Sequence, residues 1–285
     1  MTAAGPAAPG PAAPVQASRP ASHAAVVARL LRSEWTKIRS VRSTVWSLIA
    51  LVVVSVGLTA LFSLLTVGNW NGRGAAPRDA TVLADPVSSI LGTGIGLGQL
   101  AICVLGALVM TTEYSTGVIR ASLLAVPRRI PMLAAKGAVF AALILVVSEI
   151  VTFGSYLVGS AMLHSHVPVS LSDPGVLRAV IGTGLSLTLL GLFAMAIGTL
   201  IRHTAGAITT VIGIVLVLPI LSGLLPGSWG AHINAYLPEQ AGGLITQAHR
   251  HAGDLLTPWQ GFGVFCIWTA VLLVAAAYLL RRRDA

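Results

Sequence analysis

Residues 137–162 read GAVFAALILVVSEIVTFGSYLVGSAM, an apolar run that contains a single charged side chain, Glu149. A helix rises about 1.5 Å per residue, so roughly 20 residues cross a hydrocarbon core about 30 Å thick. The run is long enough for such a helix, and it is too continuous for the alternating strand of a membrane barrel. It therefore predicts a membrane-spanning α-helix.

Five further apolar runs lie on either side of this one. Only 9% of the residues are charged and 55% are hydrophobic, which is unlike the composition of a soluble domain. Because lipid offers the backbone no hydrogen-bond partner, we expect each run to be helical. The sequence thus predicts an all-α integral membrane protein with six transmembrane helices, near residues 44–67, 87–110, 137–162, 176–200, 206–225 and 259–280.

Basic residues are distributed unequally between the two sets of loops. If the N-terminus is cytoplasmic, fourteen of the 18 lysines and arginines lie inside. The exceptions are Arg73, Arg78, Arg178 and Arg250. The positive-inside rule then predicts that the N- and C-termini are both cytoplasmic. This bias also accounts for the net charge of +9, so we expect the lipid bilayer and not nucleic acid as the partner of these charges.

The N-terminal region divides into two parts. Residues 1–22 are rich in Ala, Pro and Gly and predict a disordered tail, which precedes one six-helix domain over 23–285. Residues 24–42 have apolar side chains on one side of a helix and arginines opposite, which predicts an amphipathic interface helix. Glu34 falls on the apolar side. It could pair with a neighbouring base, reach a partner protein or snorkel to the interface.

The segment between the second and third spans also has the pattern of a surface helix. Gly117 permits a sharp turn after the second span. Residues 118–125 have helical spacing and carry Arg120, and Pro127 must end that helix. A short helix bounded in this way can lie along the membrane surface. The alternative is an ordinary basic loop that only sets topology.

Glu149 is the one acid placed deep in the membrane. Such residues are costly and usually face the bundle interior or a water-filled path. Glu149 could serve a substrate path or a hydrogen bond between helices, with Ser155 and Tyr156 as possible partners. In the second span, Gly94 and Gly98 are four residues apart, a spacing that favours close helix packing.

The outer stretch 226–258 is too polar to span, and we expect one or two short helices that dip into the outer leaflet. Two His-x-His pairs, 164/166 and 249/251, also fall outside. A metal site needs more converging ligands than this spacing shows, so we expect surface histidines.

No motif predicts catalysis in this chain. Neither of its two lysines, Lys37 and Lys136, follows the glycine pattern of a P-loop. The G-x-S-x-G, H-E-x-x-H and C-x-x-C motifs are absent. We therefore expect no enzyme activity, no cofactor and no metal here.

Several segments resemble the ABC-2 type permeases, the membrane subunits of ABC exporters. Residues 33–44, SEWTKIRSVRST, resemble the interface helix of actinobacterial members, and residues 113–117, EYSTG, resemble the family's Glu-x-x-x-Gly element. Residues 127–129 resemble its Pro-x-Arg turn, Lys136 the lysine that opens the third span, and residues 279–285 a frequent ending. The sequence departs from the family at Val118, where Thr is usual, and at Arg128, where Ser is usual.

The resemblance implies a permease subunit in a bacterial plasma membrane, which exports a hydrophobic or amphipathic substrate. A separate ATP-binding subunit, holding ATP and Mg, would dock on the cytoplasmic face, and two permease chains would pair as a homo- or heterodimer. Residues 113–129 would form the coupling helix. The implied coupling residues are Glu34, Glu113, Gly117, Arg120, Pro127 and Arg129. An ion-coupled secondary transporter and a non-transporting membrane scaffold remain the alternatives.

Overall fold

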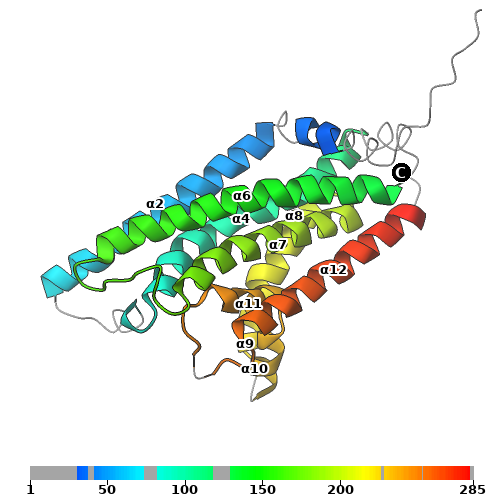
Figure 1. Cartoon of the computed structure of the whole chain (residues 1–285). Coiled ribbons are helices and arrows are strands. Elements are labelled where there is room, and N and C mark those ends of the chain that lie inside the picture. Colours follow the sequence, from blue (N-terminus) through cyan, green and yellow to red (C-terminus); the bar gives the residue numbers. More distant parts are fainter. Residues whose placement is uncertain are drawn as a thin grey trace, which may run out of the picture.

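The computed structural model describes residues 31–37, 42–73, 82–117, 129–225, 228–251 and 253–282. These residues form helices joined by turns, with no strand among them (Figure 1). Six helices are long and apolar enough to cross a membrane, as expected of a multi-pass integral membrane protein. The predicted tail, the predicted surface helix over 118–125 and most of the predicted interface helix lie outside the described residues.

All six predicted spans are present, and several are longer than predicted. The long helices are α2 (Arg42–Arg73), α4 (Pro86–Ser115), α6 (Arg129–Leu163), α7 (Val176–Ile201) and α12 (Pro258–Arg282). The fifth span, Thr204–Gly223, joins α8 (Thr204–Ile212), the π-helical turn η1 (Gly213–Val217) and α9 (Leu218–Gly223). In a regular helix Pro219 would crowd the carbonyl of Val215, and the wider π turn just before it relieves that contact.

Close helix contacts are made where glycine removes the side chain. A Cβ on Gly94 would collide with Ser55 and Thr59 of α2, and one on Gly98 would collide with Ser55. The interpretation of these glycines as a packing surface is confirmed. Gly106 plays the same part against α7, because a Cβ there would lie 2.5 Å from the Gly191 carbonyl oxygen. Small residues thus let α4 lie between α2 and α7.

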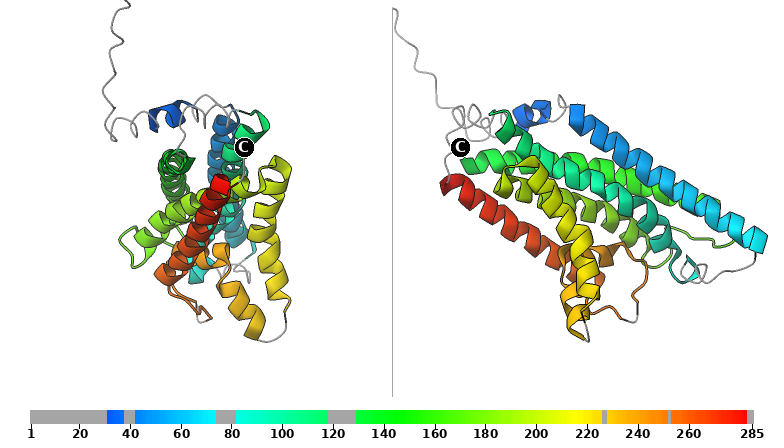
Figure 2. Two further views of the ribbon diagram at one scale, coloured as in Figure 1. Left: turned by 90° about the vertical axis from the view of Figure 1, so that its right-hand side faces the viewer. Right: turned by 180° about the vertical axis from the view of Figure 1, so that it is seen from behind.

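The stretch between the fifth and sixth spans forms short helices, as predicted. These are α10 (Ser228–Ala235), α11 (Pro238–Gly243) and the 3-10 turn η2 (Leu244–Thr246). Arg178 of α7 holds the end of this stretch, since its guanidinium donates to the carbonyl oxygens of Gln247 and Ala248, each at 3.0 Å. The fifth span and α10 project from the rest of the bundle (Figures 1 and 2).

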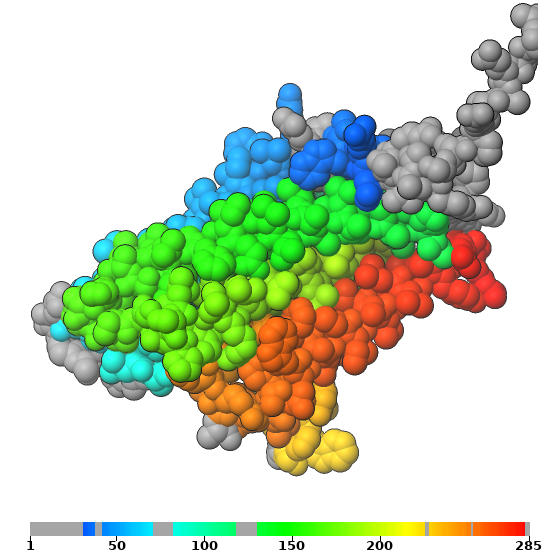
Figure 3. Space-filling view, viewed as in Figure 1, coloured from blue at the N-terminus to red at the C-terminus, as the bar shows by residue number. Residues whose placement is uncertain are grey.

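One end of the bundle collects the positive charges. Successive spans alternate in direction, so the first turns of α2 and α6 lie beside the last turns of α4, α7 and α12 (Figure 2). We call this the basic end, and it carries Lys37, Arg42, Lys136, Arg202 and Arg282. The helical segment 31–37 lies across it and rests on α6 in the space-filling view (Figure 3).

Candidate functional site

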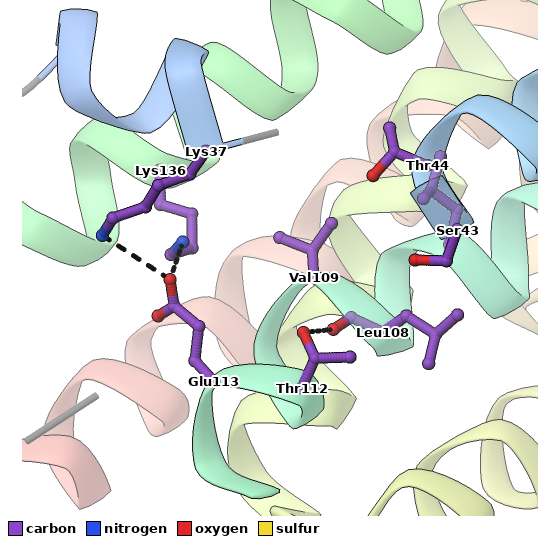
Figure 4. A pocket seen from close by; sticks show the side chains of 9 residues that line it. Lys37, Ser43, Thr44, Leu108, Val109, Thr112, Glu113 and Lys136 are labelled. Carbon is purple, nitrogen blue, oxygen red and sulfur yellow. Dashed lines mark hydrogen bonds and ion pairs between the residues drawn. The ribbon is translucent and has the colours of Figure 1, made fainter. Parts of the chain in front are cut away.

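Four charged side chains meet at the basic end, and we call them the charge cluster: Glu34, Lys37, Glu113 and Lys136. Lys136 Nζ donates to Glu34 Oε2 at 2.6 Å and to Glu113 Oε1 at 2.7 Å. Lys37 Nζ donates to Glu34 Oε1 at 2.8 Å and lies 3.7 Å from Glu113 Oε1. Figure 4 shows the two lysines approaching Glu113 from different elements. The cluster therefore ties segment 31–37 to both α4 and α6.

Local helix geometry places each member of the cluster. Glu34 and Lys37 are three residues apart, so they share one face of segment 31–37. Glu113 lies in the last turn of α4, and Lys136 lies early in α6. Gly117 ends the first of these helices with φ of 70°, in the left-handed region that glycine adopts without strain. The chain thus leaves α4 just after one member of the cluster and enters α6 shortly before another.

Three of the four members of the charge cluster are buried, and its two lysines match its two carboxylates in charge. Glu34 and Lys136 are each 2% exposed, and Glu113 is 8% exposed. A buried charge is tolerated when it is paired and hydrogen-bonded, and removing its partner is strongly destabilising. Each of the two lysines contacts both carboxylates, so the four side chains balance one another. Glu113 Oε2 has no hydrogen-bond partner among the described residues, which leaves one buried acceptor of the cluster unpaired.

Ion pairing outweighs burial at Glu34 and Lys37 of segment 31–37. Burial would raise the pKa of Glu34, but Lys136 and Lys37 hold that pKa below its usual value of 4.5. Burial would lower the pKa of Lys37, but Glu34 and Glu113 hold it above its usual value of 10.5. Both groups are therefore charged at neutral pH.

These shifts predict a pH window for stability. The contribution of Glu34 is fully present above about pH 4.5 and is lost as the pH falls through its lowered pKa. The contribution of Lys37 is present below about pH 10.5 and is lost as the pH rises through its raised pKa. We expect the gap in melting temperature between wild type and Glu34→Gln to be constant near neutrality and to shrink in acid. Circular dichroism in detergent measures it, and a gap unchanged at about pH 3 would contradict the ion-pair origin.

A small cavity of about 60 Å³ lies beside the cluster. It is lined by Lys37, Thr44, Thr112, Glu113 and Lys136, together with Ser43 and apolar side chains of α4 (Figure 4). Small-molecule sites usually measure roughly 300–1,000 Å³, so this cavity suits a few water molecules and not a substrate. The arrangement joins segment 31–37 to α4 and α6 through hydrogen-bonded ion pairs.

The predicted coupling residues are only partly brought together. Glu34 and Glu113 both belong to the charge cluster, and Gly117 makes the turn next to it. Arg120 and Pro127 lie outside the described residues, and Arg129 is the first residue of α6. The prediction that Glu34 pairs with a base is confirmed, and the snorkelling alternative is wrong because the carboxylate is buried against Lys136.

Sequence reasoning did not assign Lys37 and Lys136 as the partners of these carboxylates. Two signals pointed to them. They are the only lysines of a chain in which every other cation is arginine or histidine. Glu34 also stands on an otherwise apolar helix face, where a carboxylate needs a counter-charge.

Glu149 lies midway along α6, away from the charge cluster. Its carboxyl group packs over Gly184 of α7, where a Cβ would collide with it. The expected pairing with Ser155 or Tyr156 is wrong: the Ser155 hydroxyl has no hydrogen-bond partner among the described residues, and the Tyr156 hydroxyl donates to the Val169 carbonyl oxygen at 3.2 Å. A rise of about 1.5 Å per residue puts Tyr156 about 10 Å further along the helix, out of reach.

The histidine pairs lie on the surface at the other end of the bundle. His164, His166, His249 and His251 are exposed, and the His166 ring packs 4.9 Å from that of Trp70. In the part of the chain that the structure describes, no three His, Cys, Asp or Glu side chains converge on a common point.

No protein-family model matches this chain, and no curated protein matches it. The functional argument therefore starts from the charge cluster and the arrangement of the six spans.

Proposed function

We propose that the chain is the permease subunit of an ABC-2 type ABC transporter in a bacterial plasma membrane. With a second permease chain and a separate ATP-binding subunit, it exports a hydrophobic or amphipathic substrate. Both termini and the basic end face the cytoplasm, as the positive-inside rule requires. The observation that carries the proposal is the charge cluster, because it links segment 31–37, α4 and α6 at the face where an ATP-binding subunit would dock.

The cluster has the position that a coupling element needs. Residues 118–128 connect α4 to α6, and Glu113 and Lys136 stand on the two sides of that connection. A force applied to the connection would reach both helices through these two side chains. ATP binding can shift a permease between two states only through contacts that differ between them. Hydrogen bonds of 2.6–2.8 Å that join three elements are well suited to being contacts that differ between the two states.

The chemistry of the cluster also favours coupling over a purely structural role. Apolar residues of similar volume often stabilise a protein as well as a buried ion pair does. Four charges kept in the bundle therefore indicate a use beyond stability.

Co-purification tests the proposal. The permease, tagged and extracted in mild detergent, is expected to bring down an ATP-binding protein that is encoded beside it. Glu113→Gln should weaken that association, because it removes the carboxylate that Lys37 and Lys136 contact and so loosens the docking face. Asp173→Asn is the matched control, because it removes an exposed carboxylate at the opposite end of the bundle. An equal loss in both variants, or no ATP-binding partner at all, would overturn the assignment.

A further inference from the structure

Two adjoining cavities lie in the half of the bundle opposite the charge cluster. The inner cavity, about 120 Å³, lies between α4, α7, α11 and η2. The outer cavity, about 480 Å³, lies between α10, α11 and residues 253–255. Glu239 and Gly243 line both of them, so these two residues stand where the cavities meet. Neither cavity belongs to the proposed coupling site.

The polar groups of the inner cavity can only accept hydrogen bonds from a ligand, with the exception of the Gln99 amide. Thr183, Ser186 and Thr246 each donate their only hydroxyl hydrogen to a backbone carbonyl oxygen, at 2.7, 3.4 and 2.8 Å respectively. These hydroxyls therefore have only their lone pairs left, with which they can accept hydrogen bonds from a ligand. The Glu239 carboxylate is likewise an acceptor. A lining of this kind selects a donor-rich, positively charged group.

Among the described residues, no lysine or arginine lines either cavity, and the outer one adds a second acid, Asp254. The two nearby arginines donate to backbone carbonyls instead: Arg178 to Gln247 and Ala248, and Arg250 to the Asp254 carbonyl oxygen at 3.1 Å. Consistent with a carboxyl that lacks a counter-charge, burial raises the pKa of Glu239, although the Gln99 amide opposes that rise.

We propose that the inner and outer cavities together bind an amphipathic organic cation, with its ammonium group against Glu239. The inner cavity has room for an ammonium group and its first methylenes. The outer cavity falls within the roughly 300–1,000 Å³ of small-molecule sites and offers Leu244 and Leu255 to an apolar body. If the chain is a permease, this names the chemical class of its substrate. Only the identification of this cation as the transported substrate rests on the proposed function, because binding itself requires no ATP-binding subunit.

Fluorescence titration tests the site on the full chain in phosphatidylcholine nanodiscs. The probe is dansylcadaverine, a primary amine with an aromatic body, and the matched neutral probe is its N-acetyl derivative. We expect the amine to bind at least about tenfold more tightly, since a charge-assisted hydrogen bond is lost on acetylation. Glu239→Gln should abolish that preference, whereas Asp173→Asn, which removes an equal charge outside both cavities, should keep it. Equal binding of the two probes, or an unchanged preference in Glu239→Gln, would overturn the proposal.

A second pair of variants tests the site by volume and keeps every charge. A Cβ on Gly243 meets nothing within 4 Å, so Gly243→Ala fits the backbone and should bind the amine almost as wild type does. Gly243→Leu should fill the junction of the cavities and lower affinity by about tenfold or more. If Gly243→Leu binds normally while it remains folded by circular dichroism, the cavities are not the site.

The pH dependence supplies an independent readout. A bound cation favours the ionised carboxylate, so binding releases a proton from Glu239 wherever that group is protonated. Affinity should therefore rise with pH through the raised pKa of Glu239 and level off above it. The other titratable groups facing it are Cys103 of α4, His232 of α10 and Asp254, and all three remain in Glu239→Gln. If Glu239 carries the proton, the rise of affinity with pH must therefore vanish in that variant. A slope that persists there would assign the proton to one of those groups and contradict the proposal.

Discussion

Replacing Lys136 with methionine is expected to lower the free energy of unfolding by about 3–5 kcal/mol, the usual cost of removing one partner from a buried ion pair. Its ammonium group contacts both Glu34 and Glu113 at 2.6 and 2.7 Å, and all three side chains are buried. Methionine has a similar length but leaves both carboxylates short of a counter-charge. Unfolding in mixed detergent and dodecyl sulfate micelles, followed by circular dichroism, measures the loss.

Two comparisons separate this effect from a general loss of packing. Lys37→Met removes the same charge from a side chain that is 36% exposed, and it should cost about 1 kcal/mol or less. Adding Glu34→Gln and Glu113→Gln to Lys136→Met should restore most of the lost stability, because no buried charge is then stranded. If the two lysine variants lose the same stability, Lys136 is not the centre of the cluster.

If the chain is the permease proposed above, replacing Gly117 with proline is expected to abolish transport-coupled ATP hydrolysis by the complex with its ATP-binding subunit. Gly117 has φ of 70°, whereas proline is held near −65°, and the Gly117 N–H donates to the Tyr114 carbonyl oxygen at 3.3 Å. Proline loses both features, at a cost of about 3 kcal/mol or more. The turn after α4 must then change, and with it the direction in which the chain leaves α4 just after Glu113. Phosphate release by the purified complex in nanodiscs measures the result.

Asparagine is the matched variant at this position. It tolerates the left-handed region better than other residues that carry a Cβ, and it keeps the backbone N–H. A Cβ on Gly117 meets nothing within 4 Å, so the asparagine side chain causes no steric clash at its Cβ. Gly117→Asn should therefore retain most of the coupled hydrolysis. Normal coupling in Gly117→Pro would show that this turn does not transmit the signal.

The sequence predicted the existence of each span better than its ends. The third span was placed from residue 137, where the charged flank stops, but α6 begins at Arg129. Apolar composition predicts which residues can enter the hydrocarbon core of the membrane. It does not predict whether the helix extends beyond that core into charged residues. Lys136 lies within the helix, and its ammonium group contacts two carboxylates there. The same pairing lets α4 continue through Glu113 to Ser115.

Side-chain partners were predicted less well than helices. The odd position of Glu34 signalled a need for a base, but its strongest partner is 102 residues away. For Glu149, neighbours on the same helix were expected, yet its carboxyl group packs over Gly184 of another helix. Spacing along one helix restricts what can meet within it and says nothing about which helix lies opposite.

By itself, the sequence determined that this is a six-span helical membrane protein with its cations gathered at one end. Both properties follow from local chemistry, because the transfer of a segment into lipid and the charge of its flanks depend on that segment alone. Only the tertiary structure brought Glu34, Lys37, Glu113 and Lys136 into one cluster and set Glu239 where two cavities meet. Those juxtapositions depend on how distant helices pack, which glycine contacts such as those of Gly94 and Gly106 decide.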